Sequence, residues 1–135
     1  MAYMNQERKN KIAPQVKKIL AKYHVKGSLS VDRHTGLTLT IRSGKIDFCQ
    51  NWHDSYTKNY THDGSALDVP TYLGVNVYHI DSHFSGKACK CLEELLAAMN
   101  EGNWDRSDIQ TDYFDVGWWV SIGIGRWNKP YVLER

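Results

Sequence analysis

The sequence predicts an α+β domain, a mostly antiparallel sheet with two main helices packed on one face. Residues 116–125 alternate apolar side chains with Gly, Ser and Trp, which is the pattern of a half-buried strand. Residues 28–33 and 37–42 alternate in the same way on either side of turn residues, which predicts a hairpin. Two further segments, 5–23 and 88–99, repeat apolar residues at helical spacing.

The first predicted helix covers residues 5–23. Ile12 and Val16 begin its apolar stripe, and lysines occupy the other faces. Pro14 complicates the segment, because proline lacks the backbone donor and clashes with the preceding turn. Either the helix kinks near Asn10, or the main helix begins around the proline, which a first turn tolerates.

The segment between the hairpin and the second helix shows weaker patterns. Residues 46–48 suit a short strand, and residues 74–80 alternate as another strand would. Residues 49–74 are polar and aromatic without a period, so we expect an irregular loop. A loop of that length in a compact domain is often functional.

The second predicted helix, 88–99, follows a serine, Ser82 or Ser85, that can cap it. Lys90 and Glu94 have the spacing of an intrahelical ion pair. A continuous apolar stripe anchors this helix to the core. The stripe consists of Ala88, Cys91, Leu92, Leu95, Leu96 and Met99.

One face of the strand predicted at 116–125 is nearly bare of side chains. Gly117, Gly123 and Gly125 share it. Glycine weakens a strand interior, so three on one face predict that another backbone, a helix or a ligand covers them closely. They do not form a dinucleotide-binding motif, because the third glycine of that motif and the helix after it are missing.

The bulk composition indicates one globular domain, residues 1–135. The chain has 41% hydrophobic and 24% charged residues. No apolar run approaches the roughly 20 residues of a membrane span, and the N-terminus has no apolar core of a secretory signal. We therefore expect a cytoplasmic protein with no membrane partner.

Opposite charges concentrate in two parts of the chain, although the net charge is only +2. Residues 1–26 hold seven Lys and Arg against one Glu. Residues 101–115 hold five acidic residues against one Arg. These segments are two candidate binding surfaces of opposite sign.

The basic N-terminal helix is the first candidate. Ammonium groups beside an aromatic-rich loop suit phosphate contacts to nucleic acid combined with stacking on unpaired bases. The candidate cations are Lys11, Lys17, Lys18, Lys22 and Lys26. The candidate stacking residues are Trp52, Tyr56 and Tyr60. A lysine-rich outer face is also what any helix in water shows, so the pattern leaves both interpretations open.

The acidic segment is the second candidate. Its carboxylates fit a docking surface for a basic partner, such as a host nucleic-acid-binding protein whose groove they would fill in place of phosphates. They also suit turn caps or a divalent-cation site. The carboxylates are Asp105, Asp108, Asp112 and Asp115. In another alternative, Trp104, Trp119 and Trp127 form an apolar patch that drives homodimerisation.

Histidines beside carboxylates raise an enzymatic alternative. His53 and His62, each followed by Asp, could converge on a divalent metal for phosphoester hydrolysis. His79 and His83 are four residues apart, but a strand leading into a helix start would not bring them together. Known metallohydrolase motifs are missing, so we expect no catalytic residue, metal or cofactor.

Three cysteines, Cys49, Cys89 and Cys91, fit no disulfide framework, because their number is odd. Cys89 and Cys91 are two residues apart on a predicted helix, so their side chains diverge and cannot share a metal. We expect free, reduced thiols.

Residues 104–131 resemble a block in small uncharacterised proteins of tailed phages and prophages. The block reads Trp-Asp-x-Ser-Asp-Ile-x-Thr-Asp-Tyr-Phe-Asp-Val-Gly-Trp-Trp over 104–119 and Ile-Gly-Arg-Trp-Asn-Lys-Pro-Tyr over 124–131. It is also similar to domains appended to the large polyvalent proteins of mobile elements, and residues 6–9 and 26–31 fit the same pattern. That family supplies no catalytic residues. The resemblance implies an accessory protein acting in the bacterial cytoplasm on host machinery or nucleic acid.

The sequence therefore predicts a phage or mobile-element accessory protein that works as a binding module. Its partner would be nucleic acid or a host defence complex that handles nucleic acid. In the first case the lysines contact phosphates, and in the second the acidic segment docks on a basic groove. The alternatives are a metal-dependent phosphoester hydrolase and a structural dimerisation module.

Overall fold

The computed structural model describes residues 4–33, 35–60, 70–101, 103 and 118–134, and for residues 32 and 56–60 it describes the backbone alone. The helices in these parts of the chain are α1 (Gln6–Lys22), α2 (Phe48–Tyr60), α3 (Ile80–His83) and α4 (Gly86–Met99). The strands are β1 (Val25–Asp32), β2 (Gly36–Gly44), β3 (Leu73–Val75), β4 (Trp119–Ile124) and β5 (Val132–Leu133).

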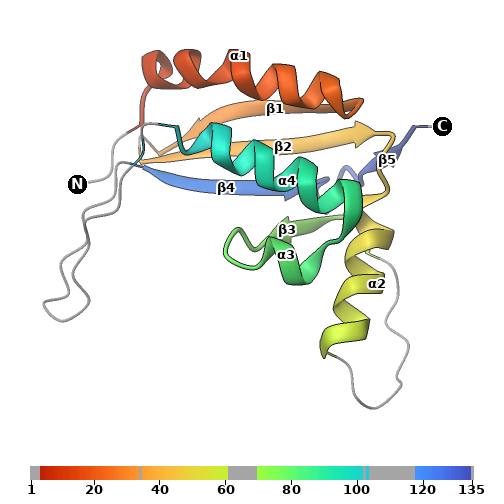
Figure 1. Ribbon diagram of the computed structural model, residues 1–135. Helices are drawn as coiled ribbons and strands as arrows, with labels where there is room; N and C mark the ends of the chain where they lie inside the picture. Colours follow the sequence, from red (N-terminus) through yellow and green to blue (C-terminus); the bar gives the residue numbers. More distant parts are fainter. Residues whose placement is uncertain (1–3, 34, 61–69, 102, 104–117, 135) are drawn as a thin grey trace, which may run out of the picture.

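The strands form one mixed sheet in the order β1-β2-β4-β3, and β5 pairs with the end of β2. Antiparallel pairs join β1 to β2 and β3 to β4, whereas β2 runs parallel to β4 and to β5. Both long helices, α1 and α4, lie on the same side of this sheet (Figure 1). The predicted α+β class, with two main helices on one face of a mostly antiparallel sheet, is confirmed.

The hairpin forms in the register that its alternation predicts. Leu29 pairs with Leu39, and Val31 pairs with Leu37. The apolar side chains of both strands therefore share one face of the sheet, since a slip of one residue would turn them all to the other face.

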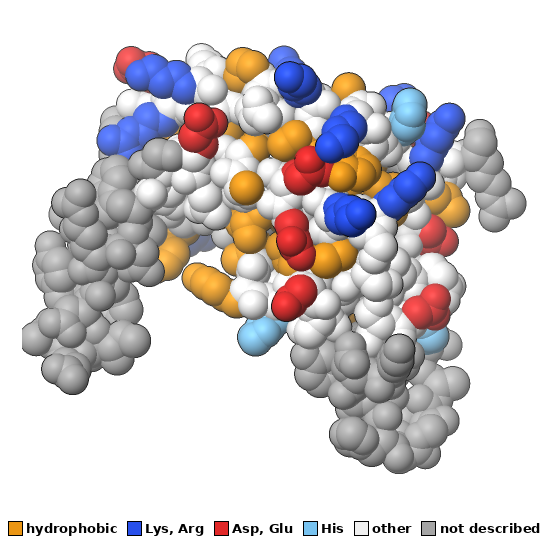
Figure 2. All heavy atoms as spheres, viewed as in Figure 1, with side chains coloured by type: hydrophobic (Ala, Val, Ile, Leu, Met, Phe, Trp, Pro, Cys, Tyr) orange, Lys and Arg blue, Asp and Glu red, His pale blue; other side chains and the backbone are white. Residues whose placement is uncertain are grey.

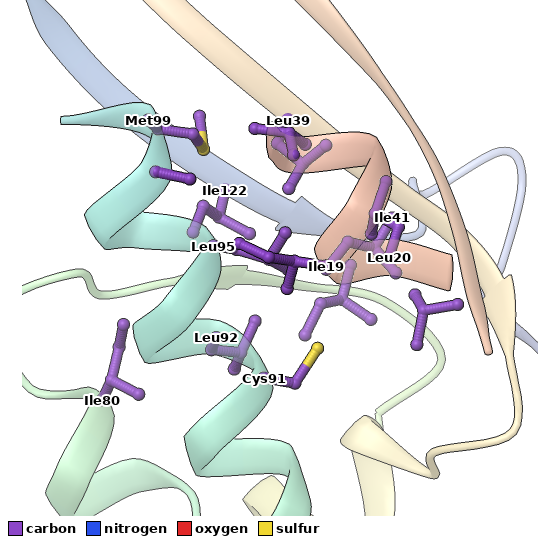
Figure 3. Close-up of a cluster of buried hydrophobic side chains, with 14 of the residues drawn as sticks. Ile19, Leu20, Leu39, Ile41, Ile80, Cys91, Leu92, Leu95, Met99 and Ile122 are labelled. Atoms are coloured by element: carbon purple, nitrogen blue, oxygen red, sulfur yellow. The ribbon is translucent and has the colours of Figure 1, made fainter. Parts of the chain in front are cut away.

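The core lies between the two main helices and the sheet. Leu39 of β2 and Ile122 of β4 point from the sheet toward the helices, and Leu92 and Leu95 of α4 point toward the sheet (Figure 3). All four side chains are buried. Burying one side chain of this size contributes about 1.5–3 kcal/mol, so this contact holds α4 on the sheet.

α1 runs unbroken from Gln6 to Lys22 with Pro14 inside it. Asn5 caps the helix, because its Oδ1 accepts a hydrogen bond from the Arg8 backbone nitrogen at 2.9 Å. The alternative in which the main helix begins at the proline is therefore wrong. Four apolar side chains of α1 are buried, and their burial outweighs the roughly 3 kcal/mol that an interior proline costs.

Residues 48–60 form α2, so the short strand predicted at 46–48 and the irregular loop predicted after it are wrong here. Asp47 caps α2, because its Oδ1 accepts from the backbone nitrogen three residues later at 3.1 Å. Phe48 is fully buried, and Trp52, one turn on, packs against the core. The rest of the helix is polar, so tertiary packing rather than a long apolar stripe determines it.

The strand predicted at 74–80 is shorter than expected. Pairing ends after β3, Leu73–Val75, and the chain then turns into α3. The side chain of Asn76 accepts from the Tyr78 nitrogen at 3.1 Å, and its carbonyl accepts from the His79 nitrogen at 3.0 Å. These bonds stabilise a turn, as asparagine side chains often do.

The predicted second helix forms as α4, with Ser85 at its N-cap position. The Ser85 hydroxyl does not cap it; Asn51 of α2 bonds instead to the Ser85 nitrogen at 2.9 Å and carbonyl at 3.0 Å. Among the described residues Glu94 pairs with Lys22 of α1, and not with Lys90 as predicted. Neither α4 nor any other helix in the described part of the chain has the length and apolarity to cross a membrane.

β4 lies within the strand predicted at 116–125 and shows the predicted alternation. Ile122 and Ile124 are buried, whereas Trp119 and Ser121 are exposed on the opposite side. We call this opposite side of the sheet, which carries Trp119 and Ser121, the open face. The long helices leave the open face uncovered.

We expected another backbone, a helix or a ligand to lie close against the three glycines of this strand, and the structure shows this at one of them. Gly125 has a φ of +66°, and a Cβ there would lie 2.6 Å from the Tyr131 nitrogen, so a returning backbone does approach it. A Cβ at Gly123 would meet no atom within 4 Å in the part of the chain that the structure describes, so the prediction is wrong for this residue there. Gly117 lies outside the described residues.

Candidate functional site

The five predicted lysines do not form one surface. Lys11, Lys18 and Lys22 follow one another at helical-turn spacing along one flank of α1. Lys22 contacts Glu94 of α4 at 2.9 Å, which places this flank beside α4. Lys and Arg side chains gather over the end of the molecule where α1 ends and α4 begins (Figure 2). Lys17 instead lies on the other flank of α1, beside the start of β1.

A cavity of about 460 Å³ lies between the end of α1 and the adjoining ends of β1 and β2. We call it the basic groove. Its charged and titratable lining residues are Lys17, His24, Lys26, Arg42, Lys45 and Glu134. Two of the predicted lysines, Lys17 and Lys26, thus come together, and they do so with cations that the sequence had not singled out.

The turn at His24 assembles the groove. His24 has a φ of +56°, uncommon for a residue other than glycine, and it turns the chain from α1 into β1. Its carbonyl accepts from the Lys45 nitrogen at 3.0 Å, which ties the end of β2 to this turn. The hairpin register places Lys26 opposite Ser43, next to Arg42 on β2. Three elements therefore bring their cations to one space.

One carboxylate, Glu134, interrupts the cationic lining. Lys26 Nζ lies 3.2 Å from Glu134 Oε1, and Ser43 Oγ donates to the same oxygen at 3.1 Å. The contact from Lys26 and then that from Ser43 lower the pKa of Glu134 below the ordinary carboxyl value of 4.5. The other lysines and the arginine of the groove form no ion pair with any residue that the structure describes. The groove therefore keeps a positive charge at neutral pH.

The predicted stacking residues lie on α2. Trp52 is half-buried and packs against the core. The side chains of Tyr56 and Tyr60 lie outside the described residues. Trp52 does not line the basic groove.

Two of the three predicted surface tryptophans are exposed. Trp119, at the start of β4, is 48% exposed. Trp127 is 79% exposed, at the tip of a turn closed by a bridge between Arg126 and Lys129. Trp119 is the first residue of β4 and Trp127 lies in the turn after this strand, so the length of the six-residue strand, about 20 Å, lies between them. Trp104 lies outside the described residues.

The carboxylates predicted to dock a basic partner also lie outside the described residues. They are Asp105, Asp108, Asp112 and Asp115. His53 lies on α2 with its Nδ1 3.4 Å from an Asp54 carboxylate oxygen, whereas His62 and Asp63 lie outside the described residues. Within the part of the chain that the structure describes, no three His, Cys, Asp or Glu side chains come close enough to hold a metal.

The expectation that His79 and His83 lie apart is wrong. α3 begins directly after His79, so the two residues are one helical turn apart and their ring centroids are 5.9 Å from each other. Burial and then the neighbouring His79 lower the pKa of His83 below 6.5. Among the described residues no third His, Cys, Asp or Glu joins the two imidazoles to form a metal site.

The three cysteines are free thiols. Burial raises the pKa of Cys49 to about 11 and that of Cys91 to about 12. Burial, followed by a hydrogen bond to Glu93, raises the pKa of Cys89 to about 11. The thiols are therefore protonated at neutral pH and are poor nucleophiles.

A signal in the sequence could have identified part of the groove. The alternation of the hairpin specifies its register, and that register brings Arg42 and Lys45 close to Lys26. No local pattern indicates that Lys17 joins them, because this depends on how α1 packs.

The comparisons with known proteins add no relative. No protein-family model, no curated protein and no solved structure matches this chain.

Proposed function

We propose that the protein binds nucleic acid, with backbone phosphates in the basic groove. One observation carries this proposal: a cavity of about 460 Å³ is lined by three lysines and an arginine against a single carboxylate. A phosphate backbone is the polyanion that suits such a lining, because each cation it neutralises releases condensed counterions.

The groove differs from an ordinary lysine-rich helix surface in how its cations are held. Lys17, Lys26 and Arg42 come from three different elements and face one space. Like charges that face one space repel each other, and salt screens this repulsion only beyond the Debye length, about 8 Å at physiological ionic strength. A bound anion relieves this repulsion. On a helix surface in open solvent there is no such repulsion for an anion to relieve.

The test compares two double variants with the same change in charge. Lys17→Glu with Lys45→Glu alters the groove, and Lys11→Glu with Lys18→Glu alters the opposite flank of α1. Binding of labelled single-stranded and duplex DNA and RNA is measured by fluorescence anisotropy at several salt concentrations. We expect the groove variant to lose more than about tenfold in affinity and to show a shallower salt dependence.

The control decides between a site and a diffuse charge effect. The flank variant should lose no more than about threefold, through the change in the general field of the protein. Equal losses in both variants would contradict the groove as the site. Failure of the wild-type protein to bind any of the oligonucleotides would contradict the function itself.

We also propose the biological setting that the resemblance implies, an accessory protein of a phage or mobile element acting in the cytoplasm of a bacterial host. The support is the block at 104–131 and the basic groove together, since both point to host machinery or nucleic acid as the target. Capture from a bacterial lysate, with and without nuclease treatment, tests it: nuclease should release the partners that nucleic acid bridges.

A further inference from the structure

The open face carries a second cavity, of about 630 Å³. Arg42, Arg126 and Lys129 supply its charged lining, and none of the residues described along it is acidic. Arg42 lines both this cavity and the basic groove. The two spaces therefore adjoin at this residue, and a ligand could pass from one to the other.

The floor of the open face carries small residues. One row across four neighbouring strands consists of Ser28, Thr40, Gly123 and Gly74. A Cβ at either glycine would meet no atom of the described residues within 4 Å, so these residues leave the space above both open. In the next row, Thr38 and Ser121 bond to each other through their hydroxyls at 2.9 Å. Small polar side chains and glycines on this face leave room for planar groups above the sheet.

Exposed indole rings lie at the start of β4 and in the turn that follows this strand. Trp127 lies in the turn that begins at Gly125, between two residues that line the cavity, Arg126 and Asn128, and only glycine fits easily under the returning Tyr131 backbone. Trp119 stands at the far end of β4. Exposing two large rings has no benefit for folding, and every nucleobase has a flat face that stacks on such rings.

We infer that the open face binds a single-stranded segment of the nucleic acid whose phosphates occupy the basic groove, with unpaired bases stacked on Trp127 and Trp119. This inference rests on the proposed function and adds the substrate class. Arg42 and Lys129 contact phosphates on the way from the groove, and the indole rings contact bases. A duplex cannot be bound in this way, because its bases are stacked on each other.

The charge of the face distinguishes this occupant from a second copy of the chain. Two open faces packed together around a two-fold axis at this cavity would bring Arg42, Arg126 and Lys129 of each copy against the same cations of the other. Like charges at a buried interface oppose association. An anionic strand neutralises them instead.

The test uses the full chain and three probes of one length: a single strand, its duplex, and a strand with abasic sites in place of its bases, in both DNA and RNA forms. Trp127→Ala and Trp119→Ala are compared with the wild type and with Trp127→Phe, which keeps an aromatic face. Circular dichroism and thermal melting confirm that each variant is folded. We expect Trp127→Ala to bind the single strand about tenfold more weakly. Binding of the duplex and of the abasic strand should be unchanged, and Trp127→Phe should retain most of the affinity.

Each other outcome counts against the inference. An equal loss on all three probes means that Trp127 does not stack on bases. Trp127→Ala could leave the single-strand affinity unchanged while Lys17→Glu with Lys45→Glu still abolishes binding. That result would keep the groove as a nucleic-acid site and contradict the open face as a binding surface. If the wild type binds none of the probes, both the proposed function and the inference about the open face are contradicted. A concentration-dependent dimer in light scattering that Trp119→Ala dissociates, and that nucleic acid does not, makes the open face a homodimer interface.

Discussion

Lys26 and Glu134 form an ion pair at the basic groove, with 3.2 Å between Lys26 Nζ and Glu134 Oε1. Glu134 is the one carboxylate among the described lining residues. The pair holds Lys26 in place in the free protein, and it also withholds that lysine's charge from a ligand. A bound phosphate must therefore compete with Glu134.

Replacing Glu134 by Gln should strengthen nucleic-acid binding. The amide can still accept from Ser43 but no longer neutralises Lys26, so about one phosphate contact is gained and the salt dependence becomes steeper by about one. We expect a gain of about two- to fivefold in affinity, measured by anisotropy at low salt. Glu7→Gln is the control, because Glu7 pairs loosely with Lys11, at 3.9 Å, on another part of α1. Weaker binding by the Glu134→Gln variant would contradict the role of this groove.

The hydroxyl of Tyr23 donates to the Glu94 carboxylate, and Lys22 contacts the same side chain, so the end of α1 is tied to α4. The bond from Tyr23 and then that from Lys22 lower the pKa of Glu94 below 4.5. Tyr23→Phe should therefore lower the melting temperature at neutral pH. Because the folded pKa is depressed, this stabilisation is present above about pH 4.5 and is lost as the pH falls through the folded value. Melting curves of the wild type and of Tyr23→Phe should show a smaller difference in melting temperature at about pH 3 than at about pH 7. An equal difference at both pH values would contradict this prediction.

Two glycines near the end of β4 should respond oppositely to alanine. Gly125 has a positive φ, and a Cβ there would lie 2.6 Å from the Tyr131 nitrogen. Gly125→Ala should therefore destabilise the protein by about 1–3 kcal/mol. Gly123 has open space and no positive φ, so Gly123→Ala should be neutral or stabilise by up to about 1 kcal/mol. Urea unfolding measures both free energies, and equal losses would refute the distinction.

Burial of the thiols predicts a loss of stability at alkaline pH. The ordinary thiol pKa is 9.0, and burial raises that of Cys91 to about 12. The unfolded chain therefore ionises this thiol first, and stability falls as the pH rises from about 9 toward the folded value. For Cys91 alone the free energy of unfolding should fall by about 2 kcal/mol between pH 8 and about pH 10.5. In Cys91→Ala the fall over the same range should be smaller by that amount; an unchanged fall would assign the alkaline sensitivity to other groups.

The sequence was sufficient to predict the elements whose pattern is local. The alternation of β4, the register of the hairpin and the two long helices all follow from which positions must be apolar, at a period of 2 or 3.6. The local pattern did not predict α2, because the buried side of this helix is short. Phe48 and Trp52 hold it on the core, and the remaining residues are polar enough to resemble a loop.

The candidate site depended mostly on tertiary structure. Lys17 and Lys18 are adjacent in the sequence, yet only Lys17 lines the groove, because successive residues of a helix point in different directions and packing decides which flank meets the sheet. The openness of the face that carries Trp119 likewise depends on both long helices packing on the other side. The sequence by itself determined which residues carry charge and which strands alternate. The packing of α1 against β1 decided which cations share one space, since that contact joins segments whose local patterns carry no information about each other.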